Sequence, residues 1–314
     1  MALRILFCGT PAFAVPSLLH LVAQPDFQVV GVVTQPDRPR GRGQKMHGSP
    51  VKDAAGAAGI PVYQPEKIKS DEAYDYFKGL APDAVVIIAY GQIISQRLID
   101  IPRLGWINLH ASLLPKYRGA APINWAIANG EKLTGLTTML IDAGLDTGPI
   151  LLKYETGIAA DETAPELTAQ LAEAGGPLIV ETLRKLDRGE IAPTPQDNSQ
   201  ASLAPILKKD DGRIDWWLSA FKIYNRIRGM QPWPGAFTTF RGKSCRIWGK
   251  PLKPIEAGGT PGVILPTKED GLLVICGAGT VLRVEHLQIE GRNRVTDGEF
   301  MSGARIKPGE RFGA

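Results

Sequence analysis

Three polar side chains at the ends of two apolar runs are the residues best suited to chemistry. The chain reads Asn-Leu-His-Ala-Ser-Leu-Leu-Pro over 108–115 and Gly-Leu-Asp-Thr-Gly over 144–148. Because residues two apart on a strand point to the same face, we expect Asn108 and His110 to share one pocket. An amide donor beside a titratable ring, with Asp146 nearby, suits acyl transfer through a tetrahedral oxyanion.

Each of these three residues also has an ordinary structural interpretation. An asparagine often caps a helix or forms a turn, a single histidine is often a satisfied structural residue, and Asp146 before Thr-Gly can form a turn. The chain has four histidines, and His110 is the one that follows a strand-like run beside an asparagine. The combination favours a functional site over three unrelated structural roles.

The elements that must position these residues belong to an α/β domain. Short apolar runs predict strands at Leu3–Cys8, Phe27–Val33, Ala84–Ala89 and Trp106–His110. The run over 84–89 is almost purely apolar, as in a central strand of a parallel sheet covered on both faces. Strand–helix alternation predicts an N-terminal Rossmann-like, doubly wound domain. Ligands of such sheets gather at the carboxyl ends of strands, where the 108–115 motif lies.

Helices are predicted on either side of this motif. After the first strand, apolar residues follow helical spacing at Phe13, Val15, Leu18, Leu19 and Val22. Residues 162–188 carry the same kind of spacing over a longer stretch, so both segments are predicted to be helices that pack apolar faces on the sheet.

The chain divides into three parts by composition. Residues 1–189 form the expected catalytic domain, and 190–209 are rich in proline and polar residues, which predicts a linker. Residues 210–314 begin with a helix near 217–228. About five short strands follow, which predict a small β-barrel of the oligonucleotide-binding type. The predicted strands are Ala236–Phe240, Ser244–Trp248, Gly262–Leu265, Leu272–Cys276 and Val281–Leu287.

Composition excludes several classes of protein. The 314 residues are 44% hydrophobic and 22% charged, as in an ordinary globular protein. No apolar run approaches the length of a membrane span, and the first residues lack a signal peptide's apolar region, so we expect a cytoplasmic protein.

The three cysteines, Cys8, Cys245 and Cys276, are far apart, which argues against a disulfide framework and against a zinc site. A monomer is the default expectation.

A basic loop and a basic C-terminal third point to a polyanionic partner. Residues 35–50 carry Arg38, Arg40, Arg42 and Lys45 against Asp37 alone. Three prolines and three glycines make regular structure unexpected there, and long unstructured loops are usually functional or disordered. Residues 210–314 hold 16 Lys and Arg but 11 Asp and Glu, which leaves them net positive.

Taken together, these sequence motifs resemble those of one known family. Over nearly its whole length the chain resembles the 10-formyltetrahydrofolate-dependent formyltransferases, and within them the branch that acts on methionyl-tRNA. The 108–115 core and Gly144–Gly148 mark the wider family, and the basic loop and second domain mark the tRNA branch. The other shared stretches are 7–13, 35–39, 41–43, 117–123, 223–229 and 231–236.

The resemblance implies roles for residues at matching positions. Asn108, His110 and Asp146 match the catalytic trio. Ser112, Leu113, Leu114 and Pro115 match the segment that contacts the folate co-substrate. In the basic loop, Arg42 matches an arginine that engages the acceptor end of the initiator methionyl-tRNA, with Arg38 and Lys45 expected to assist. Arg40 departs from the pattern, which has a small residue there. No metal is implied.

Two other interpretations remain open at this point. A formyltransferase acting on a small amine, such as a ribonucleotide or an amino sugar, would share the trio but would not need the basic loop. A non-catalytic RNA-binding protein would need no trio. A dinucleotide-binding enzyme is disfavoured because the turn after the first strand, over 9–14, lacks Gly-x-Gly-x-x-Gly.

Overall fold

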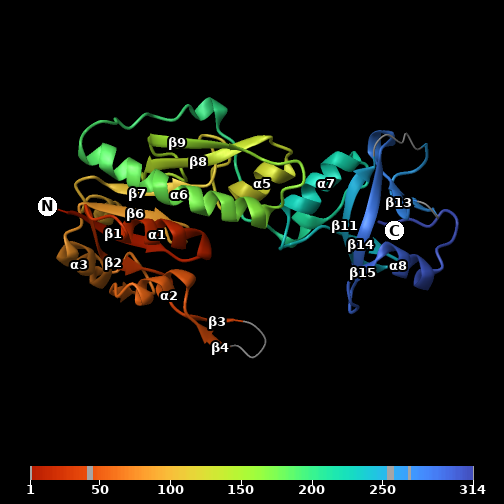
Figure 1. Ribbon diagram of the computed structural model, residues 1–314, viewed down its shortest axis with the longest axis horizontal. Helices are drawn as coiled ribbons and strands as arrows, with labels where there is room; N and C mark the ends of the chain where they lie inside the picture. The colour runs from red at the N-terminus through yellow and green to blue at the C-terminus, as the bar shows by residue number, and fades with distance from the viewer. Residues whose placement is uncertain (1, 41–44, 253–257, 268–269, 314) are drawn as a thin grey trace. The chain divides into compact units, whose positions relative to one another are not determined.

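The computed structural model describes residues 2–40, 45–252, 258–267 and 270–313 (Figure 1). The chain forms two compact units. The first comprises Met1–Pro122, Leu133–Gly157 and Leu167–Ala204, and the second comprises Ile123–Lys132, Ile158–Glu166 and Pro205–Ala314. Two short pieces from the middle of the chain therefore belong to the second unit. The domain boundaries expected near 189 and 210 stay a prediction.

The first unit is built on a seven-stranded sheet in the order β5-β2-β1-β6-β7-β8-β9. The first five strands are parallel, whereas β7–β8 and β8–β9 are antiparallel pairs. The strands are β1 (Leu3–Gly9), β2 (Phe27–Val33), β5 (Val62–Tyr63), β6 (Ala84–Ile88), β7 (Trp106–His110), β8 (Leu133–Leu140) and β9 (Ile150–Gly157). The Rossmann-like expectation is confirmed, with an antiparallel extension beyond β7.

Both faces of the central strands are covered. All five residues of β6 are buried. Its Val85 and Ile87 join a cluster with Phe77, Leu98 and Trp106, and the alternate residues of the strand are also buried. The helices are α1 (Val15–Val22), α2 (Pro50–Ala57), α3 (Asp71–Leu80), α4 (Gln96–Ile99) and α6 (Ala164–Asp187), preceded by a short 3-10 turn at Ala12–Ala14. No helix among the described residues is long and apolar enough to cross a bilayer.

Helix α1 forms where it was expected, but its buried face differs. Ser17, Leu18 and Leu21 are buried, whereas Leu19 and Val22 are 48% and 39% exposed. On a short helix, the spacing of apolar residues alone does not decide which face is buried. Ser17 faces Gly175 of α6, where an added Cβ would lie 3.1 Å from the serine hydroxyl.

The basic loop contains regular structure, contrary to the expectation for 35–50. Residues Arg38–Arg40 form β3 and Lys45–His47 form β4, which pair as an antiparallel hairpin (Figure 1). Pro39 is tolerated because a two-stranded ribbon leaves alternate backbone N–H groups outside the ladder. Composition predicted irregular backbone, but backbone pairing between two extended arms decided the local structure.

The second unit contains an antiparallel sheet in the order β10-β11-β14-β13-β12, with β15 on the edge of β14. Each of the five strands overlaps an expected strand, and the small β-domain is confirmed. The register of β11 against β14 shifts between Trp248 and Gly249, where Glu285 of β14 has no partner residue on β11. The elements are α5 (Pro122–Ala128), α7 (Ala220–Gly229), β10 (Phe237–Phe240), β11 (Lys243–Leu252), β12 (Ile264–Pro266), β13 (Leu272–Ile275), β14 (Val281–Ile289), β15 (Val295–Thr296) and α8 (Asp297–Ala304).

Polar contacts explain why residues 158–166 belong to the second unit. The Asp161 carboxylate accepts hydrogen bonds from the Tyr224 hydroxyl at 2.6 Å and from the Lys250 ammonium at 3.0 Å. These bonds lower the pKa of Asp161, and the tyrosine bond is the larger cause. The buried Arg228 guanidinium donates to the Glu162 carbonyl at 2.9 Å. The segment is therefore held by charge-assisted hydrogen bonds.

The core of the first unit makes a prediction about stability. Trp106 begins β7, is fully buried, stacks on Phe77 with ring centroids 5.4 Å apart, and donates its indole N–H to the Leu98 carbonyl at 2.8 Å. We expect Trp106→Ala to lower the free energy of unfolding by about 3–5 kcal/mol in urea denaturation. Ile93→Ala, at a residue 76% exposed, should change it by less than about 0.5 kcal/mol. Equal losses would contradict this account of the core.

Candidate active site

Strand β7 carries Asn108 and His110 at the carboxyl end of the parallel part of the sheet. Asn108 lies opposite Ile87 of β6 and Met139 of β8, so the strand is hydrogen-bonded on both sides. His110 is the last residue of the strand and is 6% exposed. The sheet therefore fixes both side chains on one face, as their spacing predicted.

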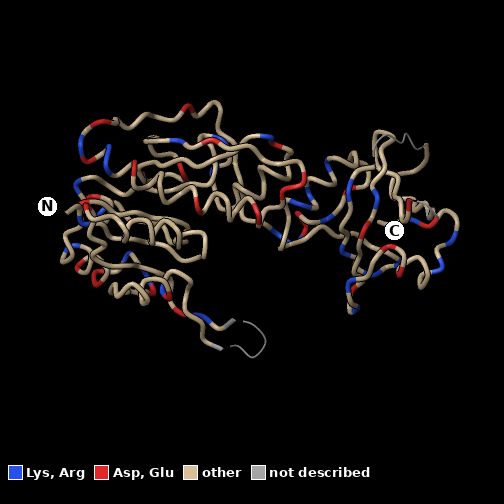
Figure 2. The backbone as a smooth tube through the Cα atoms, in the orientation of Figure 1, with Lys and Arg blue, Asp and Glu red and all other residues tan. Residues whose placement is uncertain are grey.

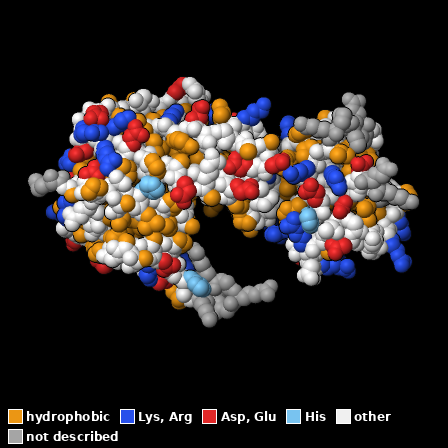
Figure 3. Space-filling model, viewed as in Figure 1, with side chains coloured by type: hydrophobic (Ala, Val, Ile, Leu, Met, Phe, Trp, Pro, Cys, Tyr) orange, Lys and Arg blue, Asp and Glu red, His pale blue; other side chains and the backbone are white. Residues whose placement is uncertain are grey.

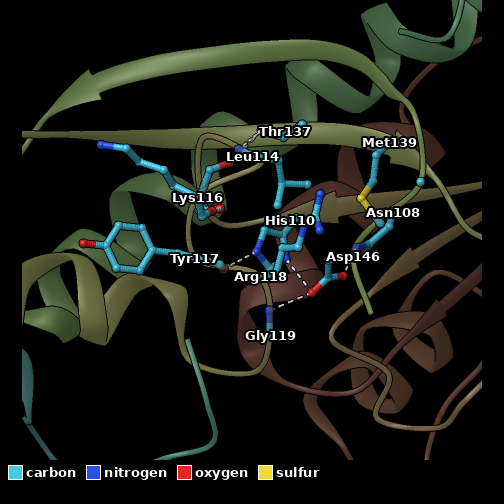
Figure 4. Close-up of polar contacts among 12 residues, drawn as sticks. Asn108, His110, Leu114, Lys116, Tyr117, Arg118, Gly119, Thr137, Met139 and Asp146 are labelled. Carbon is cyan, nitrogen blue, oxygen red and sulfur yellow. Dashed lines mark hydrogen bonds and ion pairs between the residues drawn. The ribbon is translucent and has the colours of Figure 1, made fainter. Parts of the chain in front are cut away.

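The ring of His110 is held by a backbone carbonyl. Its Nε2 lies 2.9 Å from the Tyr117 carbonyl oxygen, and because a carbonyl can only accept, Nε2 carries a proton. The other ring nitrogen, Nδ1, lies 3.6 Å from Asp146 Oδ2. The ring is thus oriented with Nδ1 toward the carboxylate (Figure 4).

Asp146 brings one carboxylate to both residues of the strand. Its Oδ1 lies 3.4 Å from Asn108 Nδ2, and its Oδ2 accepts the Gly119 N–H at 2.8 Å (Figure 4). The contacts to Asn108 and His110 are longer than the usual 2.9–3.0 Å of N–H···O bonds, whereas the contact to Gly119 is normal. The backbone therefore holds the carboxylate, and the two side-chain nitrogens are only loosely engaged.

A sharp turn at 117–119 links the histidine to the aspartate. Tyr117 has φ +61°, in the left-handed region that is uncommon for such a residue, and Gly119 has φ +121°. Through this turn the Tyr117 carbonyl reaches His110 and the Gly119 N–H reaches Asp146. The sequence predicts no role for the Tyr-Arg-Gly stretch, which lies within the family-like residues 117–123. The one sequence feature that could have indicated a turn here is Gly119, directly after Tyr117 and Arg118.

The segment expected to contact folate is largely packed into the protein. Ser112 is 1% exposed and donates its hydroxyl to the Lys116 carbonyl at 2.6 Å, and Leu114 is fully buried. Thr137 of β8 donates to the Ser112 carbonyl and accepts the Leu114 N–H. Leu113 and Pro115 are half-buried. These contacts fix the path of the segment, and its role toward a ligand stays a prediction.

Two of the expected nucleic-acid-binding residues, Arg38 and Lys45, lie on the β3–β4 pair. Arg38 is exposed at its first position. Lys45 begins β4, and its side chain lies outside the description, as does the whole of Arg42, within 41–44. Hydrogen bonds from Gln64 and Lys52 keep the pKa of Asp37 below its ordinary value. Asp37, the acidic residue of 35–50, is therefore hydrogen-bonded to Lys52 and Gln64 next to β3.

Charged residues are scattered over both units, with lysine and arginine numerous on the second (Figure 2). The space-filling view of one face shows blue side chains interspersed with red ones on that unit, without a continuous single-sign stripe (Figure 3). Across the described residues, no group of three or more His, Cys, Asp or Glu side chains is arranged to hold a metal ion.

Comparisons with known proteins identify the family of both domains. The sequence profile described as formyl transferase matches residues 3–183, and the formyl transferase C-terminal domain matches 206–305. Two solved structures share the fold: a sugar 3N-formyl transferase (TM-score 0.68, 20% identity, 93% of this chain and 100% of that chain) and an N-formyltransferase from Helicobacter canadensis (TM-score 0.65, 19% identity, 90% and 99%). The profile match over 3–183 places the chain among the formyl transferases.

Relatives with higher sequence identity show to which formyl transferase family the chain belongs. The methionyl-tRNA formyltransferase of Solibacter usitatus (strain Ellin6076) is 53% identical over 312 residues, which cover 99% of both chains. That of Koribacter versatilis (strain Ellin345) is 52% identical over 310 residues, 98% of both chains. The chain belongs to the methionyl-tRNA formyltransferase family.

The turn at 117–119 makes a second prediction. A Cβ added at Gly119 would lie 2.6 Å from the Ala204 carbonyl oxygen, in addition to the strain of its φ. We expect Gly119→Ala to lower the free energy of unfolding by more than the roughly 1–3 kcal/mol of backbone strain alone. Gly59→Ala is the matched control, because Gly59 has φ +69° with open space around its Cβ position. If the two variants unfold at the same denaturant concentration, the close approach to Ala204 is unimportant.

Proposed function

We propose that this protein transfers the formyl group of 10-formyltetrahydrofolate to the α-amino group of initiator methionyl-tRNA. The observation that carries the proposal is the convergence of the Asn108 amide nitrogen and His110 Nδ1 on the Asp146 carboxylate, at 3.4 and 3.6 Å. Family membership supports the reaction, and the geometry supports the assignment of these three residues to it.

The substrate amine is itself the nucleophile in this mechanism. A free α-amino group has a pKa of about 7.7–8.0, so a useful fraction is neutral near pH 7. The amine nitrogen attacks the formyl carbon, the new C–N bond forms, and negative charge develops on the formyl oxygen. The tetrahedral intermediate then collapses as the bond to the folate nitrogen breaks and that nitrogen takes up a proton. No covalent enzyme intermediate is needed.

Asn108 and His110 supply the donors for the developing oxyanion. Both nitrogens face the same carboxylate at distances too long for strong hydrogen bonds, so each is available to a substrate oxygen. One preorganised donor of this kind contributes on the order of 2.7–4 kcal/mol to transition-state stabilisation. The Tyr117 carbonyl keeps the ring from rotating, which preserves the direction of Nδ1.

Asp146 would carry out two tasks. Its carboxylate lies 3.6 Å from His110 Nδ1, where it would stabilise the positive charge that develops on the ring during the reaction. Directly or through a water molecule, it would also pass the proton of the attacking amine toward the leaving folate nitrogen. Its position depends on the Gly119 N–H, which the backbone supplies without any titratable group.

Folate is proposed as the one-carbon donor on two grounds. The sugar 3N-formyl transferase structure was solved in the presence of dTDP and 5-N-formyl-THF, and HypX from Aquifex aeolicus in complex with tetrahydrofolic acid. In this chain, Ser112, Leu113, Leu114 and Pro115 are assigned to the folate contact by family resemblance. The ordered path of this segment beside His110 supports that assignment. The protein supplies position and electrostatics, and folate carries the carbon unit.

The tRNA acceptor is assigned to the hairpin and the basic second domain. Arg38, Arg42 and Lys45 are proposed to bind the acceptor end, because arginine contacts phosphate and also hydrogen-bonds to base edges. The net positive charge of residues 210–314 suits the same polyanion. We further propose domain boundaries at 189 and 210, action as a monomer, and a location in the cytoplasm.

The trio makes the third prediction. Asn108→Ala and His110→Ala should each lower kcat by about 100- to 1,000-fold in a formylation assay. Asp146→Asn should produce a comparably large loss with little change in folate binding. Asp142→Asn is the matched control, because Asp142 lies exposed in the same loop and bonds only within it to Gly144 and Thr147 among the described contacts. Near-normal turnover of the folded trio variants would remove them from the mechanism.

The basic loop makes the fourth prediction. Arg42→Ala should reduce kcat/KM for methionyl-tRNA far more than it reduces folate binding, because the side chain is assigned to nucleic acid alone. Arg97→Ala, which removes a surface arginine paired with Asp71, should leave both unchanged. Equal damage to tRNA use and folate binding would indicate a folding defect in place of a lost contact.

A formyltransferase acting on a small amine is the second candidate, favoured by structural likeness to enzymes described as sugar N-formyltransferases. Single-turnover formylation of methionyl-tRNA, compared with ribonucleotide and amino-sugar amines, separates the two functions. Faster formylation of a small amine would overturn the tRNA assignment and leave the trio in place.

A further inference from the structure

Residues 194–204, which lie in the stretch expected to be a linker, run along the candidate active site. We call this segment the strap. Thr194 exchanges two backbone hydrogen bonds of 2.8 Å with Ile150, at the start of β9. At the other end, the Ala204 N–H donates to the Arg118 carbonyl at 2.7 Å, and the Arg118 N–H donates to the Ser202 carbonyl at 2.8 Å. The strap is therefore fixed to both loops that hold the site.

Between these two ends, Gln196 makes four hydrogen bonds to the same two loops. Its Nε2 donates to the Asp146 carbonyl at 2.8 Å and to the Gly148 carbonyl at 2.7 Å. Its Oε1 accepts from Arg118 Nε at 3.1 Å and from Arg118 Nη2 at 2.7 Å. One amide thus satisfies two carbonyls of the aspartate loop and the guanidinium of the 117–119 turn.

The arrangement requires an amide at this position. Arg118 is 7% exposed, so its guanidinium needs acceptors, which Gln196 and Asn198 provide. The Asp146 and Gly148 carbonyls need donors, which a carboxylate at 196 would not supply. Asp146 itself has φ +52°, an uncommon conformation that surrounding contacts must maintain.

We propose that Gln196 is a positioning residue for the reaction, which holds the Asp146 loop so that the carboxylate faces both Asn108 and His110. The inference rests on the proposed function, because it assigns Gln196 an effect exerted through Asp146. Gln196 touches no reacting atom in this account. It fixes the backbone on one side of Asp146, while the Gly119 N–H fixes the carboxylate on the other.

The test is Gln196→Glu in the full-length protein, compared with Asn198→Asp. Both variants replace an amide of the strap by a carboxylate that still accepts from Arg118, but only position 196 contacts the Asp146 loop. Gln196→Glu places an anionic oxygen against two carbonyls and should lower kcat by about 10- to 100-fold, as misplacement of a reacting group does. The KM values for folate and tRNA should stay within about twofold. Asn198→Asp should retain near-normal kcat.

A double-mutant cycle with Asp146→Asn, read out as kcat, distinguishes a positioning role from a general effect on the structure. If Gln196 acts through Asp146, the double variant should be no slower than Asp146→Asn alone. Multiplied losses, or an unchanged kcat in Gln196→Glu, would overturn the inference. Normal turnover in Asp146→Asn would instead overturn the proposed function of the trio. Should Gln196→Glu fail to fold by circular dichroism, Gln196→Met removes the same donors without charge, and the same cycle applies.

Discussion

The hydrogen bond between the buried ring of His110 and the Tyr117 carbonyl is the interaction on which the site depends. A polar ring buried at the end of a central strand must have partners, since an unsatisfied group there costs free energy. The strand itself offers none, because its backbone is paired to β6 and β8. The chain meets this requirement by folding back through the turn at 117–119. That turn in turn presents the Gly119 N–H to Asp146.

This constraint explains why strained backbone is found where it is. Tyr117, Gly119 and Asp146 have positive φ values and lie within one hydrogen-bonded network. Such conformations persist where many surrounding contacts hold them, and they concentrate at functional sites. Here the strap provides these contacts, through backbone hydrogen bonds at each end and Gln196 between them. A site that must separate a proton donor from a carboxylate by a fixed distance needs a support of this kind.

The second unit contributes in a different way. Its interior is an apolar core packed on an antiparallel sheet, and residues 210–314, which form most of it, carry a net positive charge. Charge of this kind favours a nucleic-acid partner without fixing where each phosphate lies. The proposed chemistry therefore belongs to the first unit, and the proposed choice of acceptor to the basic hairpin and the second unit.

Sequence by itself predicted β1, β2, β6, β7 and the strands β10 to β14, and it singled out Asn108, His110 and Asp146, because apolar runs and residue spacing are local properties. It missed β5, β8, β9 and β15. It identified β7 with its correct ends and placed Asn108 and His110 on one face. It did not reveal the pairing of β3 with β4, the burial of Ser17, or the contacts of Gln196. Those depend on partners far along the chain: Gln196 is 50 residues from Asp146 and 78 from Arg118. Only the tertiary structure brings these backbones together, because hydrogen-bond satisfaction is decided by proximity in space.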